Sequence, residues 1–310
     1  MTKKKLKVAY LCQWPGYAED DFILRLLGLL HGPGIECVHP RRCDLLIIGP
    51  FRQRLRGVHL GHRLALLLGL AGRRDVPRTL YQTSENTRWN ARPAEFSISS
   101  DLGVTAPNHF RFPTWMSMLD WSHEGGPAAG TKRLGPAVEI ELLMRPLGAQ
   151  KDRQVRAVFM SSHLVEPRRT LLSALRTVME VDCYGRAFPP QESHGSNRDF
   201  LKRDVCRDKQ FCLCPENSMN PGYYTEKIPE AFACGCIPIT WCDSNVSHDF
   251  NPNAIINMAE YASIGYAAGL REALQPKALQ AIREQPLLLQ RPSLDGIKEF
   301  LRRILSDVAS

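Results

Sequence analysis

The stretch Phe211–Asp243 reads FCLCPENSMNPGYYTEKIPEAFACGCIPITWCD, and it is the most informative part of the chain. Its pattern is that of an apolar strand, a polar loop, a short helix, a glycine turn and a second apolar strand. Such alternation indicates an α/β sheet. In open α/β sheets, ligands bind in the crevice beyond the carboxyl ends of the strands. We therefore expect a binding site in the loop between these two strands.

That loop gathers polar side chains where the helix is expected to begin. A helix that opens at Thr225–Glu226 directs backbone N–H groups and its positive dipole end toward the loop. Lys227 adds a mobile positive charge at the same end, and the two together suit a phosphate or diphosphate. The segment therefore predicts a binder of a phosphorylated ligand. The loop side chains that suit contact with it are Asn217, Tyr223, Thr225, Glu226 and Lys227.

Composition and charge narrow the class of protein. The 310 residues are 44% hydrophobic and 23% charged, which is typical of a soluble globular protein. The formal charge of +8 fits nucleic acid, an anionic membrane or a phosphorylated substrate as partner. The arginines are scattered and no nucleic-acid recognition motif occurs, so we expect no nucleic acid partner. No apolar run is long enough to predict a transmembrane helix.

The basic start, Met1–Lys7, resembles the first part of a signal peptide. The apolar run behind it, Val8–Cys12, is short and no cleavage-like site follows, so we expect a cytoplasmic protein. Ten cysteines could indicate disulfides or zinc, but the close pairs are one residue apart, without the two-residue gap of zinc knuckles. Reduced, buried thiols are the expectation.

Alternating strands and helices predict two α/β domains. Strands are expected at Leu6–Cys12, Asp44–Gly49, Arg78–Gln82 and Phe96–Ser99, within a first domain at residues 1–125. Residues 126–154 are rich in glycine at their start and are expected to form a linker. A second domain is expected at 155–292, where the pattern restarts.

Residues 293–310 predict a C-terminal helix, because apolar side chains recur there at helical spacing. The stripe favours a helix packed on the protein. The basic flank of this helix leaves peripheral contact with the inner face of a membrane open as an alternative.

The central segment resembles glycosyltransferase family ten, the α-1,3/4-fucosyltransferases. Those enzymes carry F-x-L-x-x-E-N-S, then Y-x-T-E-K, then a short helix and I-P-I. The residues that fit are Phe211, Leu213, Glu216, Asn217, Ser218, Tyr223, Thr225, Glu226, Lys227, Ile237, Pro238 and Ile239. Asp249–Pro252 resembles the family's D-F-x-P, and thinner agreement occurs at Ser84–Asn86, at Arg111–Trp115 and at Arg168. The chain departs from the pattern at His163, where relatives usually have asparagine, and at Pro229.

The resemblance implies a bacterial-type enzyme with two facing Rossmann-like domains, the B-type glycosyltransferase fold. It implies GDP-β-L-fucose as donor and inverting transfer of L-fucose to a hydroxyl of a glycan acceptor, usually the 3-hydroxyl of N-acetylglucosamine. In bacteria such enzymes decorate lipopolysaccharide or surface polysaccharide precursors. Transfer of another GDP-linked sugar, and a catalytically silent nucleotide- or glycan-binding protein, remain the alternatives.

Inverting transfer needs a base for the acceptor hydroxyl, and the resemblance points to Glu85, which follows the expected strand Arg78–Gln82. The alternative is a loop carboxylate that pairs with Arg88 or Arg92. The departing diphosphate needs cations, for which Arg168 and Lys227 are the candidates, with Asn217 as a neutral donor.

The roles of four further residues depend on the resemblance or on neighbouring residues. The resemblance implies that Glu226 accepts hydrogen bonds from sugar or ribose hydroxyls and that Tyr223 contacts the nucleoside. Arg169 adjoins Arg168, so either arginine could point into the site, and His163 is either a supporting group or simply structural. We expect neither a cofactor nor a divalent metal, because fixed cations and a helix N-terminus can neutralise the diphosphate.

Overall fold

The computed structural model describes residues 4–14, 16–55, 58–72, 75–127, 137–149, 152–189, 192 and 202–309. They form two compact units. Unit 1 comprises Met1–Ala137 and Pro292–Ser310, and unit 2 comprises Val138–Arg291. The chain first passes from unit 1 to unit 2 between Ala137 and Val138, inside the expected linker 126–154. Residues 128–136, 150 and 151 of this linker lie outside the described residues.

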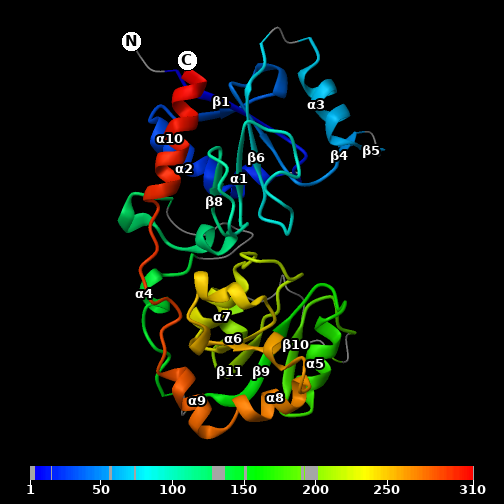
Figure 1. The fold of residues 1–310 in the computed structure, drawn as a ribbon, viewed down its shortest axis with the longest axis vertical. Helices are drawn as coiled ribbons and strands as arrows, with labels where there is room; N and C mark the ends of the chain where they lie inside the picture. The colour runs from blue at the N-terminus through cyan, green and yellow to red at the C-terminus, as the bar shows by residue number, and fades with distance from the viewer. Residues whose placement is uncertain are drawn as a thin grey trace. The chain divides into compact units, whose positions relative to one another are not determined.

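Unit 1 is built on a six-stranded parallel sheet. In spatial order its strands are β2 (Ile35–Cys37), β1 (Leu6–Leu11), β3 (Leu45–Ile48), β6 (Arg78–Gln82), β7 (Phe96–Ser99) and β8 (His109–Arg111) (Figure 1). The four strands predicted for this domain from the sequence are thus confirmed to within one residue at each end. The other elements of unit 1 are α1 (Tyr17–Asp20), α2 (Phe22–His31), α3 (His62–Leu70), the hairpin of β4 (Gln53–Leu55) and β5 (Val58–Leu60), and 3₁₀ turns at Pro40–Arg42, Thr114–Met118 and Ser122–Glu124.

Helices α2 and α3 cover opposite faces of this sheet. Successive side chains of β1 alternate between these faces, so neighbouring residues of β1 meet different helices. Leu11 belongs to an apolar cluster that includes Ala65 of α3. Tyr10 faces the other way and donates a hydrogen bond from its hydroxyl to Asp21, at 2.7 Å. Asp21 is the N-cap of α2 and accepts the backbone N–H of Ile23 at 2.9 Å, so one buried carboxylate both starts the helix and ties it to the sheet.

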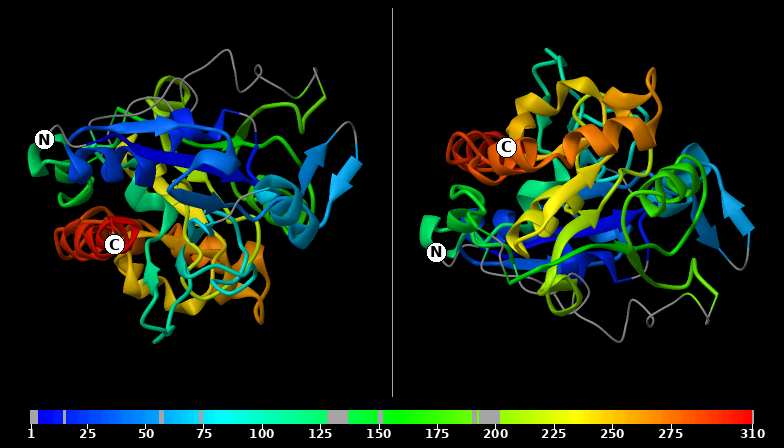
Figure 2. Two further views of the ribbon diagram at one scale, coloured as in Figure 1. Left: turned by 90° about the horizontal axis from the view of Figure 1, so that it is seen from above. Right: turned by 90° about the horizontal axis from the view of Figure 1, so that it is seen from below.

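The last helix, α10 (Asp295–Ala309), belongs to unit 1, as Figures 1 and 2 show with α10 in red near α2 in blue. Phe300 packs against Phe96 and Phe110, with ring centroids 6.1 and 5.5 Å apart. The backbone carbonyl of Asp307 accepts a hydrogen bond from Arg78 Nε at 3.0 Å. The apolar stripe predicted from the sequence is therefore core, and it is formed by Ile297, Phe300, Leu301 and Ile304.

Unit 2 contains a five-stranded parallel sheet. Its spatial order is β10 (Val181–Tyr184), β9 (Gln154–Met160), β11 (Lys209–Leu213), β12 (Ile237–Thr240) and β13 (Ile256–Asn257). Both strands of the opening segment are present as the neighbours β11 and β12, with Leu213 opposite Ile239. The remaining elements are α4 (Ile140–Leu143), α5 (Arg168–Arg176), α6 (Lys202–Cys206), α7 (Lys227–Ala233), α8 (Tyr266–Ala273), α9 (Pro276–Arg283) and 3₁₀ turns at Ser244–His248, Pro252–Ala254 and Met258–Tyr261.

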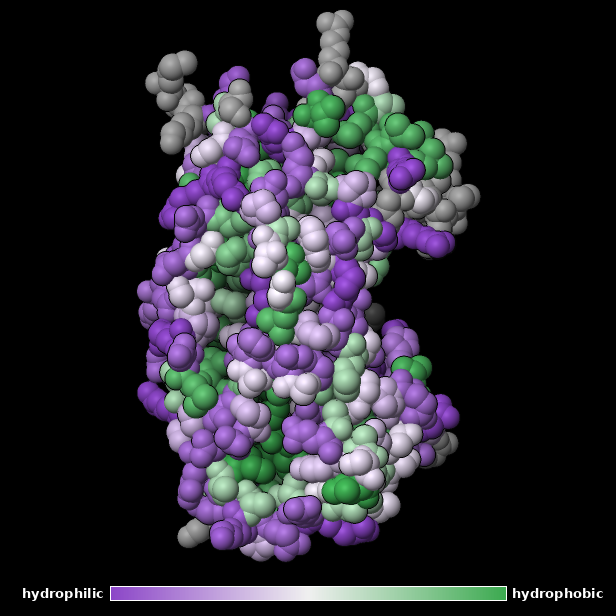
Figure 3. Space-filling view, viewed as in Figure 1, coloured by the Kyte–Doolittle hydropathy of each residue, from purple (hydrophilic) through white to green (hydrophobic). Residues whose placement is uncertain are grey.

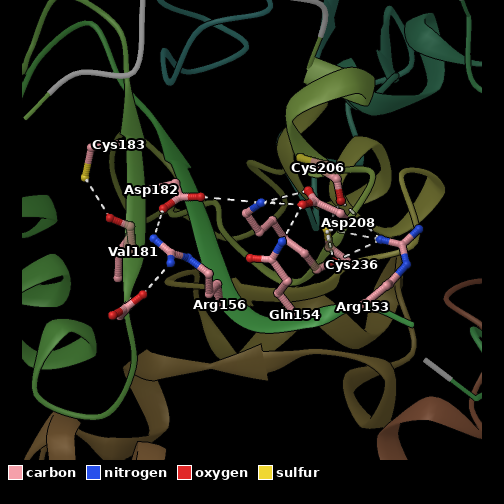
Figure 4. A network of polar contacts seen from close by, with 11 residues as sticks. Arg153, Gln154, Arg156, Val181, Asp182, Cys183, Cys206, Asp208 and Cys236 are labelled. Carbon is pink, nitrogen blue, oxygen red and sulfur yellow. Dashed lines mark hydrogen bonds and ion pairs between the residues drawn. The ribbon is translucent and has the colours of Figure 1, made fainter. Parts of the chain in front are cut away.

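A network of charged side chains fixes the amino edge of this sheet (Figure 4). Arg156 on β9 contacts Asp182 on β10 at 2.5 Å, and Lys209 at the start of β11 contacts Asp208 at 2.7 Å. Arg153 donates hydrogen bonds to three backbone carbonyls, those of Cys206, Lys209 and Cys234. The network lies at the opposite edge of the sheet from the loops that follow the strands. It therefore holds the strands in place without taking part in those loops.

The ten cysteines are all described and none is in a disulfide, in agreement with the expectation of reduced thiols. Eight are buried, Cys234 is half-buried and Cys37 is exposed. Among the described residues, no helix is both long enough and apolar enough to cross a bilayer.

Candidate functional site

The carboxyl edge of the unit 2 sheet brings together Arg168 and Asn217, which the sequence predicts as site residues. Arg168 begins α5 and contacts the Asn217 side-chain oxygen with one guanidinium nitrogen, while another donates to the carbonyl of His163 at 3.2 Å. Partial burial lowers the pKa of Arg168, and nearby Glu216 and Tyr223 oppose this effect. The guanidinium nevertheless stays charged at any relevant pH, because the pKa of a free arginine is above 12.

The choice between Arg168 and Arg169 is resolved by their hydrogen bonds. Arg169 is exposed and donates to the carbonyl of Leu164 at 3.2 Å, so the contact to Asn217 comes from Arg168. His163 takes part through its backbone carbonyl, and its ring lies 3.4 Å from the Arg186 guanidinium. Its side chain is therefore not what positions Arg168.

Glu216 holds the other cation of the site in place. Its carboxylate is fully buried and accepts the backbone N–H of Thr225 at 2.8 Å and the ammonium of Lys227 at 3.1 Å. Burial alone would lower the pKa of Lys227, but the carboxylates of Glu216 and Glu226 raise it above its usual value. Lys227 is therefore a fixed cation, in contrast to the mobile charge expected from the sequence.

Glu216 also accepts a hydrogen bond from Thr225, two residues before α7 begins. The sequence predicts a helix that opens at Thr225–Glu226, whereas α7 runs from Lys227 to Ala233 with Glu226 as its N-cap residue. Because the Thr225 N–H is bonded to Glu216, it does not point toward a ligand.

The two remaining predicted residues, Tyr223 and Glu226, precede Lys227 in the same loop. The Glu226 carboxylate is partly exposed, 3.9 Å from the Lys227 ammonium. Burial opposes its ionisation, but Lys227 and Lys202 lower its pKa on balance, so Glu226 is a carboxylate that can accept hydrogen bonds. Tyr223 is only 3% exposed and lies close enough to Arg168 and Lys227 to affect their pKa values, which places it beneath the loop surface.

Glu85 belongs to unit 1, in contrast to the five other predicted residues. It lies in the loop after β6, and its backbone N–H donates to the buried Thr83 hydroxyl at 3.1 Å. Arg88 forms an ion pair with Asp101, and Arg92 donates to the carbonyls of Ala91 and Pro50. Arg88 and Arg92, the two candidate partners of Glu85, thus also contact other groups.

Three aromatic side chains of unit 1 were not predicted as site residues. Trp14 follows β1 and lies with its ring centroid 4.8 Å from that of Phe51, which follows β3, and 5.3 Å from that of Tyr17. Burial, and then the charge of Asp21, raise the pKa of Tyr17, and Glu85 adds a smaller effect in the same direction. We call Trp14, Tyr17 and Phe51 the aromatic shelf. The signal in the sequence was their position after strands at the carboxyl edge of the sheet.

The residues that the structure describes contain no group of three or more histidine, cysteine, aspartate or glutamate side chains placed to hold a metal ion. The cationic group of unit 2 instead consists of Arg168 and Lys227, both next to the buried Glu216. Two fixed cations beside an amide are suited to a diphosphate, because charge-assisted hydrogen bonds to phosphate oxygens are strong.

Residues 149–277 match the family model described as "Glycosyltransferase family 10 (fucosyltransferase) C-term". Residues 149–277 are therefore similar to the C-terminal part of glycosyltransferase family 10, in agreement with the resemblance seen in the sequence.

One curated relative and several solved structures are similar to the chain. An α-(1,3)-fucosyltransferase, FucT, of Helicobacter pylori is 31% identical over 124 residues, which are 37% of this chain and 25% of that protein. The chain thus spans about a quarter of that relative's length in the match. A crystal structure of an α1,3-fucosyltransferase has a TM-score of 0.67 at 20% identity and covers 98% of this chain and 91% of its own. A crystal structure of α1,3-fucosyltransferase with GDP-fucose gives 0.65 at 20% identity, over 98% and 92%. The expected α/β class with two Rossmann-like domains is confirmed.

Proposed function

We propose that the chain is an inverting fucosyltransferase that moves L-fucose from GDP-β-L-fucose to a hydroxyl of a glycan acceptor. The observation that carries the proposal is the pair of fixed cations, Arg168 and Lys227, at the carboxyl edge of a domain similar to that of family 10. The similarity to a fucosyltransferase structure determined with GDP-fucose supports this donor.

Arg168 and Lys227 neutralise the charge that grows on the diphosphate as the bond between fucose C1 and the phosphate oxygen breaks. Asn217 uses its side-chain oxygen to accept from Arg168, so its Nδ2 group is the part that donates to a phosphate oxygen. The reaction on this proposal needs no divalent metal, because both charges are already held by the protein.

Glu85 takes the proton from the acceptor hydroxyl while that oxygen attacks C1 of the fucose. Attack from the face opposite the leaving GDP inverts the anomeric configuration. Glu226 accepts hydrogen bonds from hydroxyls of the fucose or ribose, and Tyr223 supports the nucleoside end of the donor. These two roles rest on the family resemblance, together with the partial exposure of the Glu226 carboxylate.

The aromatic shelf is the proposed platform for the acceptor sugar. Binding sites for small molecules combine apolar or aromatic walls with a few polar groups. Trp14, Phe51 and Glu85 follow the neighbouring strands β1, β3 and β6, at the same edge of the sheet. The acceptor we propose is a chain ending in N-acetyllactosamine, attacked through the 3-hydroxyl of N-acetylglucosamine. By its likeness to bacterial enzymes, we place its work in the cytoplasm, on precursors of lipopolysaccharide or surface polysaccharide.

A donor panel tests the proposal. The purified chain is incubated with N-acetyllactosamine and either GDP-fucose or GDP-mannose, and GDP release is followed over time. We expect release that depends on GDP-fucose and on the acceptor. Faster turnover of GDP-mannose than of GDP-fucose would show that the donor is another GDP-linked sugar. Tight GDP binding without turnover on any acceptor would identify a catalytically silent binder.

A further inference from the structure

Helix α3 of unit 1 has one face in the core and a second apolar face in solvent. Ala65 is buried against the sheet, and Gly69 lies close to Leu11 of β1. The outward positions hold three leucines spaced as i, i+3 and i+4, which form one stripe. Leu64, Leu67 and Leu68 are 46%, 70% and 46% exposed.

This stripe is unusual on the described surface. Figure 3 shows apolar side chains gathered over α3 at the upper right. The loop that follows α3 also holds Val76, which is 84% exposed. Contiguous exposed apolar side chains mark an interaction surface more often than isolated ones do. The patch is defined here as Leu64, Leu67 and Leu68 and is called the α3 patch.

Positive charge surrounds the α3 patch in the sequence. Residues 52–74 contain six arginines and no acidic residue. Arg63 lies on α3 itself and is exposed. Helices that lie in a membrane interface combine an apolar face with lysine or arginine in the same way. Basic side chains near an anionic membrane surface gain further attraction from its negative potential.

We propose that the α3 patch docks on an anionic lipid surface, with the leucines at the boundary between headgroups and acyl chains and Arg63 at the lipid phosphates. A second copy of this chain fits less well, because it would bring the same basic segment against this one. Nucleic acid would satisfy the arginines but leave the leucines in water. The docking does not depend on the proposed reaction.

The alternative membrane contact, α10, does not offer an apolar face. Its apolar stripe is buried in unit 1, and its exposed side chains at positions 299, 302, 303 and 306 are polar. Within unit 1, α10 and α3 lie on opposite sides of the sheet (Figures 1 and 2). Variants of the two helices therefore distinguish membrane binding through α3 from membrane binding through α10.

The test is flotation of the full chain with vesicles of phosphatidylcholine alone or mixed with phosphatidylglycerol. We expect binding to the anionic vesicles that weakens as salt is raised. Leu67→Ser should weaken it by about tenfold, because an apolar side chain no longer leaves water. Arg63→Gln should weaken it by about fivefold, which corresponds to one basic side chain near the surface.

Two matched controls accompany these variants. Leu289→Ser changes a leucine of unit 2 that is 67% exposed and should leave binding unchanged. Arg302→Gln removes an exposed arginine of α10 and should have a smaller effect than Arg63→Gln. Since all four positions are exposed, the variants should keep the far-ultraviolet circular dichroism of the parent chain.

Binding to anionic vesicles that is lost in Leu67→Ser but kept in Leu289→Ser supports the proposal. The proposal is overturned if the parent chain does not float with anionic vesicles, or if Leu67→Ser floats as well as the parent. A dimer in sedimentation equilibrium that Leu67→Ser dissociates would assign the patch to a second copy. The chain could instead bind single-stranded RNA, with binding weakened by Arg63→Gln but not by Leu67→Ser. That result would show that the basic side chains bind nucleic acid rather than lipid.

Discussion

Glu216 explains how two cations can be held at one loop of unit 2. A buried carboxylate is costly unless it is paired and hydrogen-bonded. Here it accepts bonds from the backbone and hydroxyl of Thr225 and from the ammonium of Lys227. The same charge lies close enough to Arg168 to affect its pKa. The carboxylate therefore fixes Lys227 and helps to keep Arg168 nearby before any ligand arrives.

Lys227→Ala should weaken GDP binding by roughly 10- to 100-fold, because a charged hydrogen bond to phosphate is lost. It should also lower the free energy of unfolding by about 1–3 kcal/mol, since Glu216 is then buried without its cation; the figure is reduced because the Lys227 side chain is 20% exposed. Calorimetric titration with GDP and urea unfolding measure the two effects.

A second substitution separates these effects of Lys227→Ala. Adding Glu216→Gln removes the unpaired charge, so it should restore part of the stability without restoring GDP affinity. Lys277→Ala, at an exposed lysine of the same unit, is the control and should change neither quantity. Unchanged GDP affinity in Lys227→Ala would remove Lys227 from the site.

Glu85→Gln keeps the size of the side chain and removes its ability to take a proton. We expect transfer to fall by about 100-fold or more, because general base catalysis contributes on that order. The Kd for GDP should stay within about twofold, a change too small to signal a lost contact. Glu36→Gln, at an exposed carboxylate of β2, should transfer fucose at the parent rate. Parent-like turnover in Glu85→Gln would exclude it as the base.

At the scale of secondary structure elements, the strands and the start of α7 were predictable to within one residue, whereas the contacts that hold the loop before α7 were not. Runs such as Leu45–Ile48 are apolar throughout because both faces of a parallel strand are covered, and this leaves a strong local signal. The loop before α7 is held by Glu216, nine residues before Thr225 in the chain. That carboxylate reaches the Thr225 N–H only because the loop folds back, which no local pattern indicates.

The same holds for the candidate site: residues in contiguous motifs were predictable, and contacts between distant parts of the chain were not. Arg168, Asn217 and Lys227 could be named from a family resemblance, since their motifs are contiguous. The ion pair of Lys227 with Glu216 and the aromatic shelf could not, because they depend on where loops from separate strands meet. Trp14 and Phe51 are far apart in sequence but follow the neighbouring strands β1 and β3.

Trp14→Ala tests the aromatic shelf. We expect the acceptor KM to rise by roughly tenfold, because loss of an aromatic wall removes apolar contact with the sugar. Affinity for GDP should not change, since unit 2 holds the cations. Steady-state kinetics with varied N-acetyllactosamine measure the effect, and Trp14→Phe, which keeps a ring, should recover most of it. An unaltered acceptor KM in Trp14→Ala would place the acceptor elsewhere.

At the scale of the whole molecule, the chain leaves unit 1, forms unit 2 and returns to unit 1 through α10. The sequence predicts a terminal packed helix but not the unit on which it packs. Its apolar spacing shows that one face is buried, whereas its partners Phe96 and Phe110 are almost 200 residues earlier in the chain. Unit 1 is thus completed only by the last residues.

Phe300→Ala should therefore destabilise unit 1, by about 3–5 kcal/mol, which is the usual cost of removing a buried phenylalanine. Unfolding followed by tryptophan fluorescence should show the loss, and GDP affinity at the folded temperature should be retained because its ligands lie in unit 2. Leu289→Ala, at an exposed site, is the control with little expected change. Equal stability of Phe300→Ala and the parent would show that α10 is not part of the core.

The central claim is that this chain transfers fucose with inversion from GDP-β-L-fucose. Proton NMR of a reaction with N-acetyllactosamine tests it most directly, because the anomeric signal reports both transfer and configuration. We predict an α-linked fucose on the acceptor that accumulates in step with GDP. A β-linked product, or GDP released with free fucose and no fucosylated product over a panel of glycan acceptors, would contradict the account.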